Sequence, residues 1–356
     1  MKITSIPIPT SRPYDVEIAS GLLACLGEKA ANLTPGRRAA LVSDSAVAPL
    51  YGQRAQAALE EAGFFVCTYV FPQGEASKNG ETYLNLLHFL TQNQITREDL
   101  LVALGGGVTG DLTGFAAATY LRGVPYLQVP TTLLAMVDSS VGGKTAINLP
   151  AGKNLAGAFH SPRLVLCDTD TLASLPPAVF QAGCGEVIKY AVLTGQPLTH
   201  LVRSGVRRHI QAVIAHCVAA KGALVQADEW DTGPRQLLNL GHTLGHAVEA
   251  GSRFALAHGA CVGIGLAMMA RAAASFGICP AETRDEILAL LRQYQLPTET
   301  DLDPETLCRL TLGDKKRRGA HITLVIPRAI GDCILHEISI EALPRWIAAG
   351  YPEARL

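Results

Sequence analysis

An uninterrupted apolar run, Leu100-Leu101-Val102-Ala103-Leu104, leads directly into three glycines, Gly105-Gly106-Gly107. A strand that is apolar on both faces belongs inside a sheet covered on both sides, as parallel sheets are. Strands that alternate with helices predict such a sheet. Further strand-like runs lie at 39–43, 64–70, 126–129 and 164–167, and helical patterns lie at about 47–62 and 81–93.

The pattern changes after Leu175-Pro176-Pro177, because the chain to about Leu312 is rich in Ala, Leu and Val at helical spacing. One late strand, at 322–326, follows a basic turn. A chain of 356 residues is long enough for about two domains. We therefore expect an α/β domain with a parallel sheet over residues 1–175 and an all-helical, or mainly helical, domain over 176–356.

Composition excludes several classes of protein. Hydrophobic residues make up 48% of the chain, which excludes disorder, and a net charge of −1 lacks the basic excess of a general nucleic-acid binder. Nine cysteines without a Cys-x-x-Cys pair indicate reduced thiols, and the first residues lack the apolar segment of a signal peptide. The longest uncharged apolar run, 254–270, is interrupted by His258 and favours a buried helix over a membrane span. We expect a soluble, cytoplasmic protein with no nucleic-acid or membrane partner.

The glycines that follow the apolar run form a Gly-x-Gly-x-x-Gly pattern at 105, 107 and 110. Glycines between a strand and a helix allow a pyrophosphate to approach the backbone, although a simple tight turn is the alternative. The next strand, 126–129, ends without an acidic residue for a ribose, a role that Asp44 or Glu75 could fill. The turn is therefore predicted to bind phosphate outside the usual dinucleotide frame.

A second glycine-rich segment, Gly142-Gly143-Lys144-Thr145, does not fit a nucleoside-triphosphate loop. That loop requires an earlier glycine at a fixed spacing, and Asp138 stands at this position. The spacing therefore argues against a kinase or an ATPase.

Three polar residues, Asn239, His242 and His246, are spaced to share one face of a helix, and His258 follows 16 residues after His242. Histidines on an apolar face can simply be core residues, but catalytic zinc sites often use two histidines and one carboxylate. Glu186 lies in an otherwise apolar helical run, where an unpaired charge would be costly. The pattern favours a metal site with Glu186 as a ligand.

Cations and polar residues gather among the glycines and small residues of segment 122–154 and recur in the second half of the chain. Any single lysine can be a solvated surface charge, but together they indicate a multiply anionic small substrate. With the glycine-rich turn and the metal pattern, they predict a nicotinamide-type cofactor and a divalent metal in a cleft between two domains. The residues concerned are Arg122, Asp138, Lys144, Lys153, Asn154, Lys221, Arg235, Lys315 and Lys316.

At these positions the chain resembles the 3-dehydroquinate synthases of the shikimate pathway, over nearly its whole length. The resemblance is carried by ordered segments: 105–111, Arg122-Gly123, 129–132 with 138–145, 152–154, 186–189, 239–243 with Gly245-His246, His258-Gly259 and 314–316.

The resemblance implies an N-terminal NAD-binding α/β domain, a helical C-terminal domain and an active site between them. The implied reaction converts 3-deoxy-arabino-heptulosonate 7-phosphate to 3-dehydroquinate and phosphate. Transient oxidation by NAD is followed by phosphate elimination, re-reduction and an intramolecular aldol step, which makes the enzyme a carbon–oxygen lyase. The implied metal is zinc or cobalt, held by Glu186, His242 and His258.

The resemblance also implies roles for further residues. Arg122 is implied to reach the neighbouring subunit of a homodimer, and Lys316 or Lys315 to contact the phosphate. The residues implied to contact substrate are Asp138, Lys144, Asn154, Lys189, Lys221, Arg235, Asn239 and His246. Those implied to bind NAD are Asp44, Gly74, Glu75, Lys78, Gly106, Gly107, Val108, Thr109, Gly110, Asp111, Thr131, Thr132, Lys144, Lys153 and Thr171.

Two positions depart from the family pattern. Ala260 replaces the usual Glu two residues after His258, a change that bears on metal affinity or identity. Gly185 replaces the usual Ala before Glu186, and we expect this change to be tolerated.

Three alternative functions remain to be weighed. A related sugar-phosphate cyclase would act on a substrate without a carboxylate, which the intact 142–145 segment and Arg235 disfavour. A metal-dependent polyol dehydrogenase of similar fold would produce NADH. A non-enzymatic descendant of the enzyme would be expected to lose metal ligands or cations, and none of those expected in direct contact is lost here.

Overall fold

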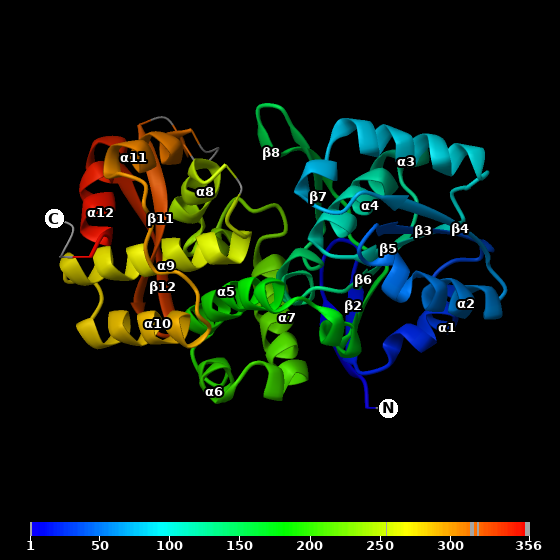
Figure 1. Ribbon diagram of the computed structural model, residues 1–356, viewed down its shortest axis with the longest axis horizontal. Helices are drawn as coiled ribbons and strands as arrows, with labels where there is room; N and C mark the ends of the chain where they lie inside the picture. Colours follow the sequence, from blue (N-terminus) through cyan, green and yellow to red (C-terminus); the bar gives the residue numbers. More distant parts are fainter. Residues whose placement is uncertain (1, 254, 314–316, 319, 353–356) are drawn as a thin grey trace. The chain divides into compact units, whose positions relative to one another are not determined.

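A computed structural model describes residues 2–253, 255–313, 317–318 and 320–352. Its contacts divide the chain into two units (Figure 1). The first contains Met1–Leu175 and Lys221–Trp230, and the second contains Pro176–Ala220 and Asp231–Leu356. Helix α7 (Ile210–Ala227) is therefore divided between them. The sequence had assigned all of 176–356 to the second domain, whereas segment 221–230 packs with the first.

The first unit is built on a seven-stranded sheet with the order β1-β2-β9-β6-β5-β3-β4. All neighbouring pairs are parallel except β1 with β2. Its strands are β1 (Thr4–Ile8), β2 (Tyr14–Ala19), β3 (Arg38–Asp44), β4 (Phe65–Phe71), β5 (Leu100–Gly105), β6 (Tyr126–Pro130) and β9 (Leu164–Asp168). The five strand-like runs of the sequence correspond to β3, β4, β5, β6 and β9.

Helices cover both faces of this sheet, because alternate residues of each central strand are apolar on both sides. Leu41 and Val102 pack against α1 (Leu26–Ala31) and α2 (Gln53–Glu61). Val42 and Leu101 face the other way, against α3 (Gly80–Gln92) and α4 (Gly107–Thr119). A hairpin of β7 (Lys144–Leu149) and β8 (Gly152–Phe159), which the sequence patterns did not reveal, adds a separate antiparallel pair.

The second unit is helical, as expected, with one small antiparallel sheet. Leu244, Met268, Leu324 and Ile347 belong to its shared apolar core. The helices are α5 (Pro177–Thr194), α6 (Leu198–Ser204), α8 (His242–Gly251), α9 (His258–Ser275), α10 (Ala281–Gln293), α11 (Pro304–Leu312) and α12 (Leu343–Gly350). The strands are β10 (Arg317–Arg318), β11 (His321–Ala329) and β12 (Asp332–Ser339), of which only β11 was expected.

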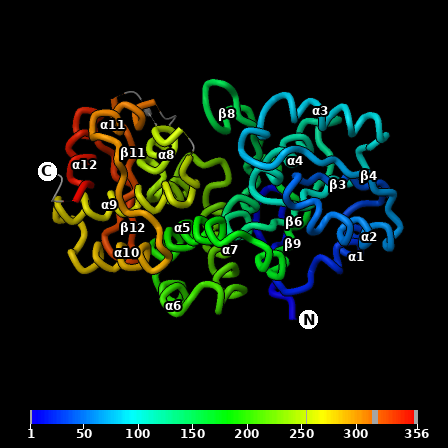
Figure 2. The backbone as a smooth tube through the Cα atoms, viewed as in Figure 1, coloured from blue at the N-terminus to red at the C-terminus, as the bar shows by residue number. Residues whose placement is uncertain are grey.

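Glycines bring the backbones of α8 and α9 close together (Figure 2). A Cβ atom at Gly245 of α8 would lie 2.9 Å from the carbonyl oxygen of Cys261 in α9. The close approach matters for function because both helices carry candidate metal ligands.

Among the described residues, one helical stretch, Arg207–Ala227, is long and apolar enough to cross a membrane by length and composition. This is weak evidence for a span, because core helices of soluble proteins meet the same criterion.

Candidate functional site

Three side chains of the second unit converge around the carboxylate of Glu186. Glu186 lies in the middle of α5 and is completely buried. His242, the first residue of α8, places Nε2 3.3 Å from Glu186 Oε1, and His258, the first residue of α9, places Nε2 3.2 Å from the same oxygen. The three residues predicted to bind metal are therefore adjacent.

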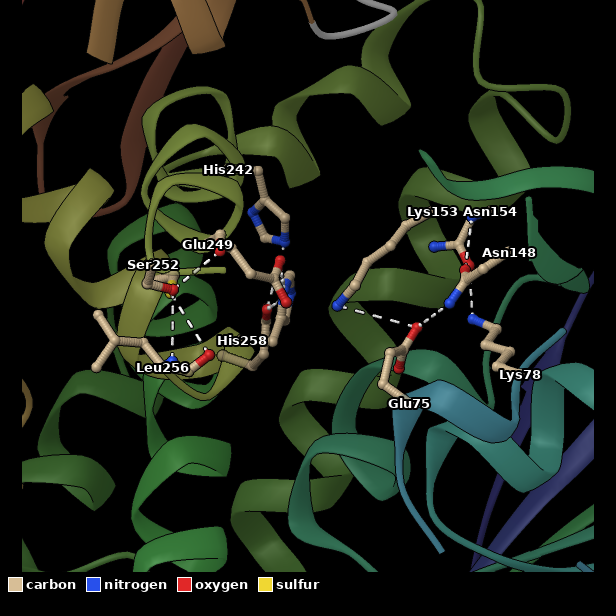
Figure 3. A network of polar contacts seen from close by, with 12 residues as sticks. Glu75, Lys78, Asn148, Lys153, Asn154, His242, Glu249, Ser252, Leu256 and His258 are labelled. Carbon is tan, nitrogen blue, oxygen red and sulfur yellow. Dashed lines mark hydrogen bonds and ion pairs between the residues drawn. The ribbon is translucent and has the colours of Figure 1, made fainter. Parts of the chain in front are cut away.

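The other ring nitrogens of the two histidines point elsewhere. His242 Nδ1 lies 3.1 Å from the carbonyl oxygen of Leu240, and His258 Nδ1 lies 3.3 Å from Glu249 Oε2 (Figure 3). Because a carbonyl oxygen can only accept a hydrogen bond, Nδ1 of His242 carries the proton and Nε2 has the lone pair. Both rings thus direct Nε2 toward Glu186.

This arrangement fits a divalent metal such as zinc. Neither oxygen of Glu186 has a hydrogen-bond partner of acceptable geometry among the described residues, although Lys189 Nζ lies 2.6 Å from Oε2. Ligand atoms at about 2.0–2.1 Å from tetrahedral zinc are about 3.4 Å apart. The measured separations of 3.2 and 3.3 Å match that spacing.

The electrostatics also favour an ionised carboxylate. Burial alone would raise the pKa of Glu186, but Lys189 and His242 outweigh it and hold the pKa well below its usual range. Burial lowers the pKa of His242 to about 4. Burial opposes charge on His258 too, but hydrogen bonding to Glu186 and Glu249 raises its pKa to about 9. A metal therefore competes with a proton mainly at His258.

His246 lies beside this cluster. It follows His242 by one turn of α8, and its ring centroid is 5.4 Å from that of His242 and 5.8 Å from that of His258. One nitrogen from each of the three rings falls within a 4.8 Å group that could also hold a metal. The shorter separations around Glu186 favour the set predicted from the sequence and leave His246 beside it.

Glycines set the spacing between α5 and α9 next to two of these ligands. A Cβ atom at Gly185 would lie 2.2 Å from the carbonyl oxygen of Gly259. A Cβ atom at Gly259 would lie 1.8 Å from the carbonyl oxygen of Ala182. The expectation that alanine and glycine are interchangeable at position 185 is therefore wrong for this chain, because no methyl group fits without movement of the helices.

The remaining candidates of the second unit lie near the start of α8. Arg235 and Asn239 belong to the short helix Pro234–Asn239, and Arg235 is only 1% exposed although it carries a charge. A buried guanidinium is costly unless it is paired, and the carboxylate of an anionic ligand is one partner that suits its geometry. Lys315 and Lys316 lie outside the described residues.

In the first unit, the predicted cofactor residues lie mainly at the carboxyl ends of parallel strands. Asp44 ends β3, Gly106 follows β5, Thr131 follows β6 and Thr171 follows β9. The chain runs from β3 outward to β4 and then back to β5 on the other side of β3, so the strand order reverses between β3 and β5. Open α/β sheets bind ligands at such a reversal.

The glycine-rich turn lies at this reversal and opens α4. A Cβ atom at Gly105 would lie 2.3 Å from Thr109 Oγ1, so the turn requires glycine there. Thr109 Oγ1 is also 3.3 Å from Asp44 Oδ2, which joins the ends of two strands. The buried Thr131 hydroxyl has no hydrogen-bond partner among the described residues. These features fit a ligand with phosphate and hydroxyl groups, and residues 107–111 form the first turns of α4 beside it.

A polar network connects several other predicted residues of this unit (Figure 3). Lys78, only 4% exposed, forms an ion pair with Asp111 and donates a hydrogen bond of 2.6 Å to Asn154 Oδ1. Burial raises the pKa of Asp111 even with this ammonium group beside it. Asn148 donates to Glu75 Oε1 at 2.7 Å, and the ion pair from Lys153 to the same oxygen spans 3.9 Å.

Sequence reasoning missed Asn148, because the hairpin that carries it gave no strand signal. It is the residue that joins the two halves of this network: its Oδ1 accepts a hydrogen bond of 2.9 Å from the backbone of Asn154, while its side-chain nitrogen binds Glu75. A prediction of the hairpin at 144–159 would have placed it beside Lys153 and Asn154. The network therefore depends on β7 and β8.

The last predicted residues of the first unit lie at three places. Lys221 Nζ is 3.1 Å from Asp138 Oδ1 and donates a 2.7 Å hydrogen bond to the carbonyl oxygen of the same residue. Lys144 begins β7 and is exposed, and Arg122 is exposed with a positive φ of 68°. Gly74 precedes the short helix at Glu75 and has a positive φ of 103°. Thr132, Val108 and Gly110 flank the turn already described.

Comparisons with known proteins agree with this picture. The chain matches the family model described as 3-dehydroquinate synthase N-terminal over residues 68–182 and the one described as 3-dehydroquinate synthase C-terminal over residues 183–317. A 3-dehydroquinate synthase from Pelobacter propionicus is 44% identical over 340 residues, which cover 93% of this chain and 94% of the relative.

Solved structures give the same fold. A 2-deoxy-scyllo-inosose synthase in complex with carbaglucose-6-phosphate, NAD+ and Co2+ matches with a TM-score of 0.87 at 24% identity, covering 96% of this chain and all of the other. A 2-epi-5-epi-valiolone synthase from Streptomyces hygroscopicus subsp. jinggangensis with NAD+ and Zn2+ bound matches with a TM-score of 0.86 at 26% identity, covering 98% and 99%. Both the sequence and the fold therefore show that this chain belongs to the 3-dehydroquinate synthase family.

Proposed function

We propose that this chain converts 3-deoxy-D-arabino-heptulosonate 7-phosphate to 3-dehydroquinate and phosphate, as a carbon–oxygen lyase that depends on NAD and on zinc or cobalt. The observation that carries the proposal is the convergence of Glu186 Oε1, His242 Nε2 and His258 Nε2 in a chain of this family. Two solved structures of the same fold with NAD+ and Co2+ or Zn2+ bound support both cofactors.

Glu186, His242 and His258 would hold the metal. When bound, the metal supplies a Lewis acid that polarises a substrate oxygen. Lys189, 2.6 Å from Glu186 Oε2, keeps this carboxylate ionised and ready to bind a cation. Two hydrogen bonds at Nδ1 keep the rings of His242 and His258 oriented. His246 is close enough to exchange a proton with a ligand held at this cluster.

NAD would bind at the strand ends of the first unit. When bound, it accepts a hydride from the substrate and returns it within the same turnover. The start of α4 provides backbone N–H groups for the pyrophosphate, and Asp44 is a candidate for a ribose hydroxyl. The residues proposed to bind NAD are Asp44, Gly74, Glu75, Lys78, Gly106, Gly107, Val108, Thr109, Gly110, Asp111, Thr131, Thr132, Lys144, Lys153 and Thr171.

The substrate carries a carboxylate and a phosphate, and the chain offers cations for both. We assign the carboxylate to Arg235, whose guanidinium can form two parallel hydrogen bonds with it. Asp138, Lys144, Asn154, Lys189, Lys221, Asn239 and His246 are proposed as further substrate contacts, and Lys316 as a phosphate contact. We also propose a cytoplasmic homodimer with no nucleic-acid or membrane partner, in which the exposed Arg122 reaches the second subunit.

Phosphate release from the heptulosonate tests the proposal, with and without a metal chelator. We expect release that requires metal and NAD, while NADH does not accumulate because oxidation and reduction occur on one bound substrate. Steady formation of about one NADH per phosphate would instead indicate a dehydrogenase. Absence of release from metal- and NAD-loaded protein would overturn the assignment.

Two histidine variants localise the metal. His258→Ala should abolish both stoichiometric zinc and activity, whereas His216→Ala, which removes an exposed histidine of α7, should retain both. Full zinc occupancy in His258→Ala would refute the ligand set.

A further inference from the structure

Glu249 is a buried carboxylate that none of the roles proposed above uses. It lies in the last turn of α8, and only 5% of its surface is exposed. It follows His242 by seven residues and His246 by three, so all three share one face of the helix. Isolated carboxylates are rarely buried, because the loss of hydration costs several kcal/mol.

The contact of Glu249 with His258 crosses between two helices. Its Oε2 lies 3.3 Å from His258 Nδ1, while Nε2 of the same ring faces Glu186 at 3.2 Å (Figure 3). His242 shows the same pattern, with the carbonyl oxygen of Leu240 in place of the carboxylate. Each of the two rings therefore has Nδ1 bonded to an acceptor and Nε2 directed to the cluster.

We propose that Glu249 is a positioning residue that orients His258 and fixes the proton on its Nδ1, so that Nε2 presents a lone pair to the metal. This inference rests on the proposed metal site. A carboxylate behind a ligating histidine fixes its tautomer and strengthens it as a ligand, and loss of such a partner weakens metal binding about 10–100-fold. The position two residues after His258 cannot supply this carboxylate, because it is Ala260.

The test measures zinc affinity directly, by competition with a chromogenic chelator. Glu249→Gln keeps the shape and an acceptor oxygen but removes the charge, and we expect zinc binding to weaken about 10-fold. Glu249→Ala removes the acceptor, and we expect a loss that approaches 100-fold. With Co2+ as the probe, the visible absorption bands of both variants should shift, since the orientation of one ligand changes.

Ser252→Ala is the matched control. It removes a 2.9 Å hydrogen bond from the Ser252 hydroxyl to the backbone of Glu249, at the same helix end, but leaves the carboxylate in place. We expect its zinc affinity to stay within about 2-fold of wild type. If Ser252→Ala weakens zinc as much as Glu249→Ala, the helix end rather than the carboxylate is responsible, and the proposal is overturned.

The outcome also separates this inference from the proposed metal site. Wild-type protein that binds no stoichiometric zinc would overturn both. Wild-type protein that binds zinc, with unchanged affinity and unchanged Co2+ bands in folded Glu249→Gln, would overturn only the role of Glu249. The glutamine variant keeps the test decisive even if the alanine variant fails to fold.

Discussion

Replacing Gly259 with alanine places a methyl group where α5 and α9 are in close contact. The new Cβ atom would lie 1.8 Å from the carbonyl oxygen of Ala182, and ordinary contacts begin at 3.4 Å. The two backbones would therefore have to separate by about 1.6 Å at this point. The partner atom belongs to the backbone of a buried helix, so rotation of a side chain cannot relieve the clash.

The separation acts directly on the metal cluster, because Gly259 follows His258 and the contacted turn of α5 precedes Glu186. The 3.2 Å distance from His258 Nε2 to Glu186 Oε1 would increase by a similar amount. Metal–ligand distances tolerate changes of only about 0.2 Å. We therefore expect zinc affinity to fall at least about 100-fold, the upper end of losses seen when only a ligand's supporting partner is removed.

Stability should decrease as well. Overpacking of a buried contact costs about 1–3 kcal/mol, which lowers the melting temperature of a domain of this size by roughly 2–12 °C. Thermal unfolding of the zinc-free protein measures this effect separately from metal binding. Gly185→Ala should give a smaller change, since its Cβ would meet Gly259 at 2.2 Å rather than 1.8 Å.

Gly80→Ala is the control, because this helical glycine of α3 has no atom within 4 Å of its Cβ position. It should leave zinc affinity unchanged and alter stability by less than about 1 kcal/mol. The reasoning is refuted if Gly259→Ala retains wild-type zinc affinity and melting temperature. It is also refuted if all three variants lose the same amount.

Three further outcomes are expected. Arg235→Leu should raise KM for the heptulosonate about 10–100-fold, at about 1.4 kcal/mol per tenfold, with little effect on an analogue that lacks the carboxylate; equal losses for both compounds would contradict the assignment. Lys78→Met leaves Asp111 unpaired and should cost about 3 kcal/mol of unfolding free energy, whereas Lys29→Met, at a more exposed pair with Glu17, should cost less than about 1 kcal/mol. Burial lowers the pKa of His160 below 6.5, so the unfolded chain binds the proton more readily and stability should fall as the pH drops below about 6.5; His160→Gln should flatten this part of the melting-temperature profile, and an unchanged profile would contradict it.

Local patterns in the sequence were sufficient for much of the fold. The continuous apolar run at 100–104 predicted a strand buried on both faces, and β5 lies inside the sheet between β6 and β3. Such a pattern is readable because burial on both faces excludes polar residues along the whole strand. The same holds for the helical face of Asn239, His242 and His246, since helical periodicity is a property of neighbouring residues. Extending that face by one turn would also have reached Glu249.

Other features depend on contacts between distant segments, and these only the tertiary structure decided. The hairpin of β7 and β8 carries mostly small and polar residues, so its strands have no apolar signature, and its pairing alone brings Asn148 to Glu75. Segment 221–230 reads as helix like its neighbours, yet it packs with the first unit, where Lys221 meets Asp138.

The spacing of helices is the clearest case. The sequence by itself determined which side chains can bind a metal, because carboxylate and imidazole chemistry is a property of each residue. It did not determine how closely α5 and α9 approach, and so it could not show that Gly185 and Gly259 must lack side chains. Nor could it pair Glu249 with His258, because no local pattern encodes a contact between two helix faces. Steric exclusion and a hydrogen bond between helices are properties of packed backbones, and only the tertiary structure specifies them.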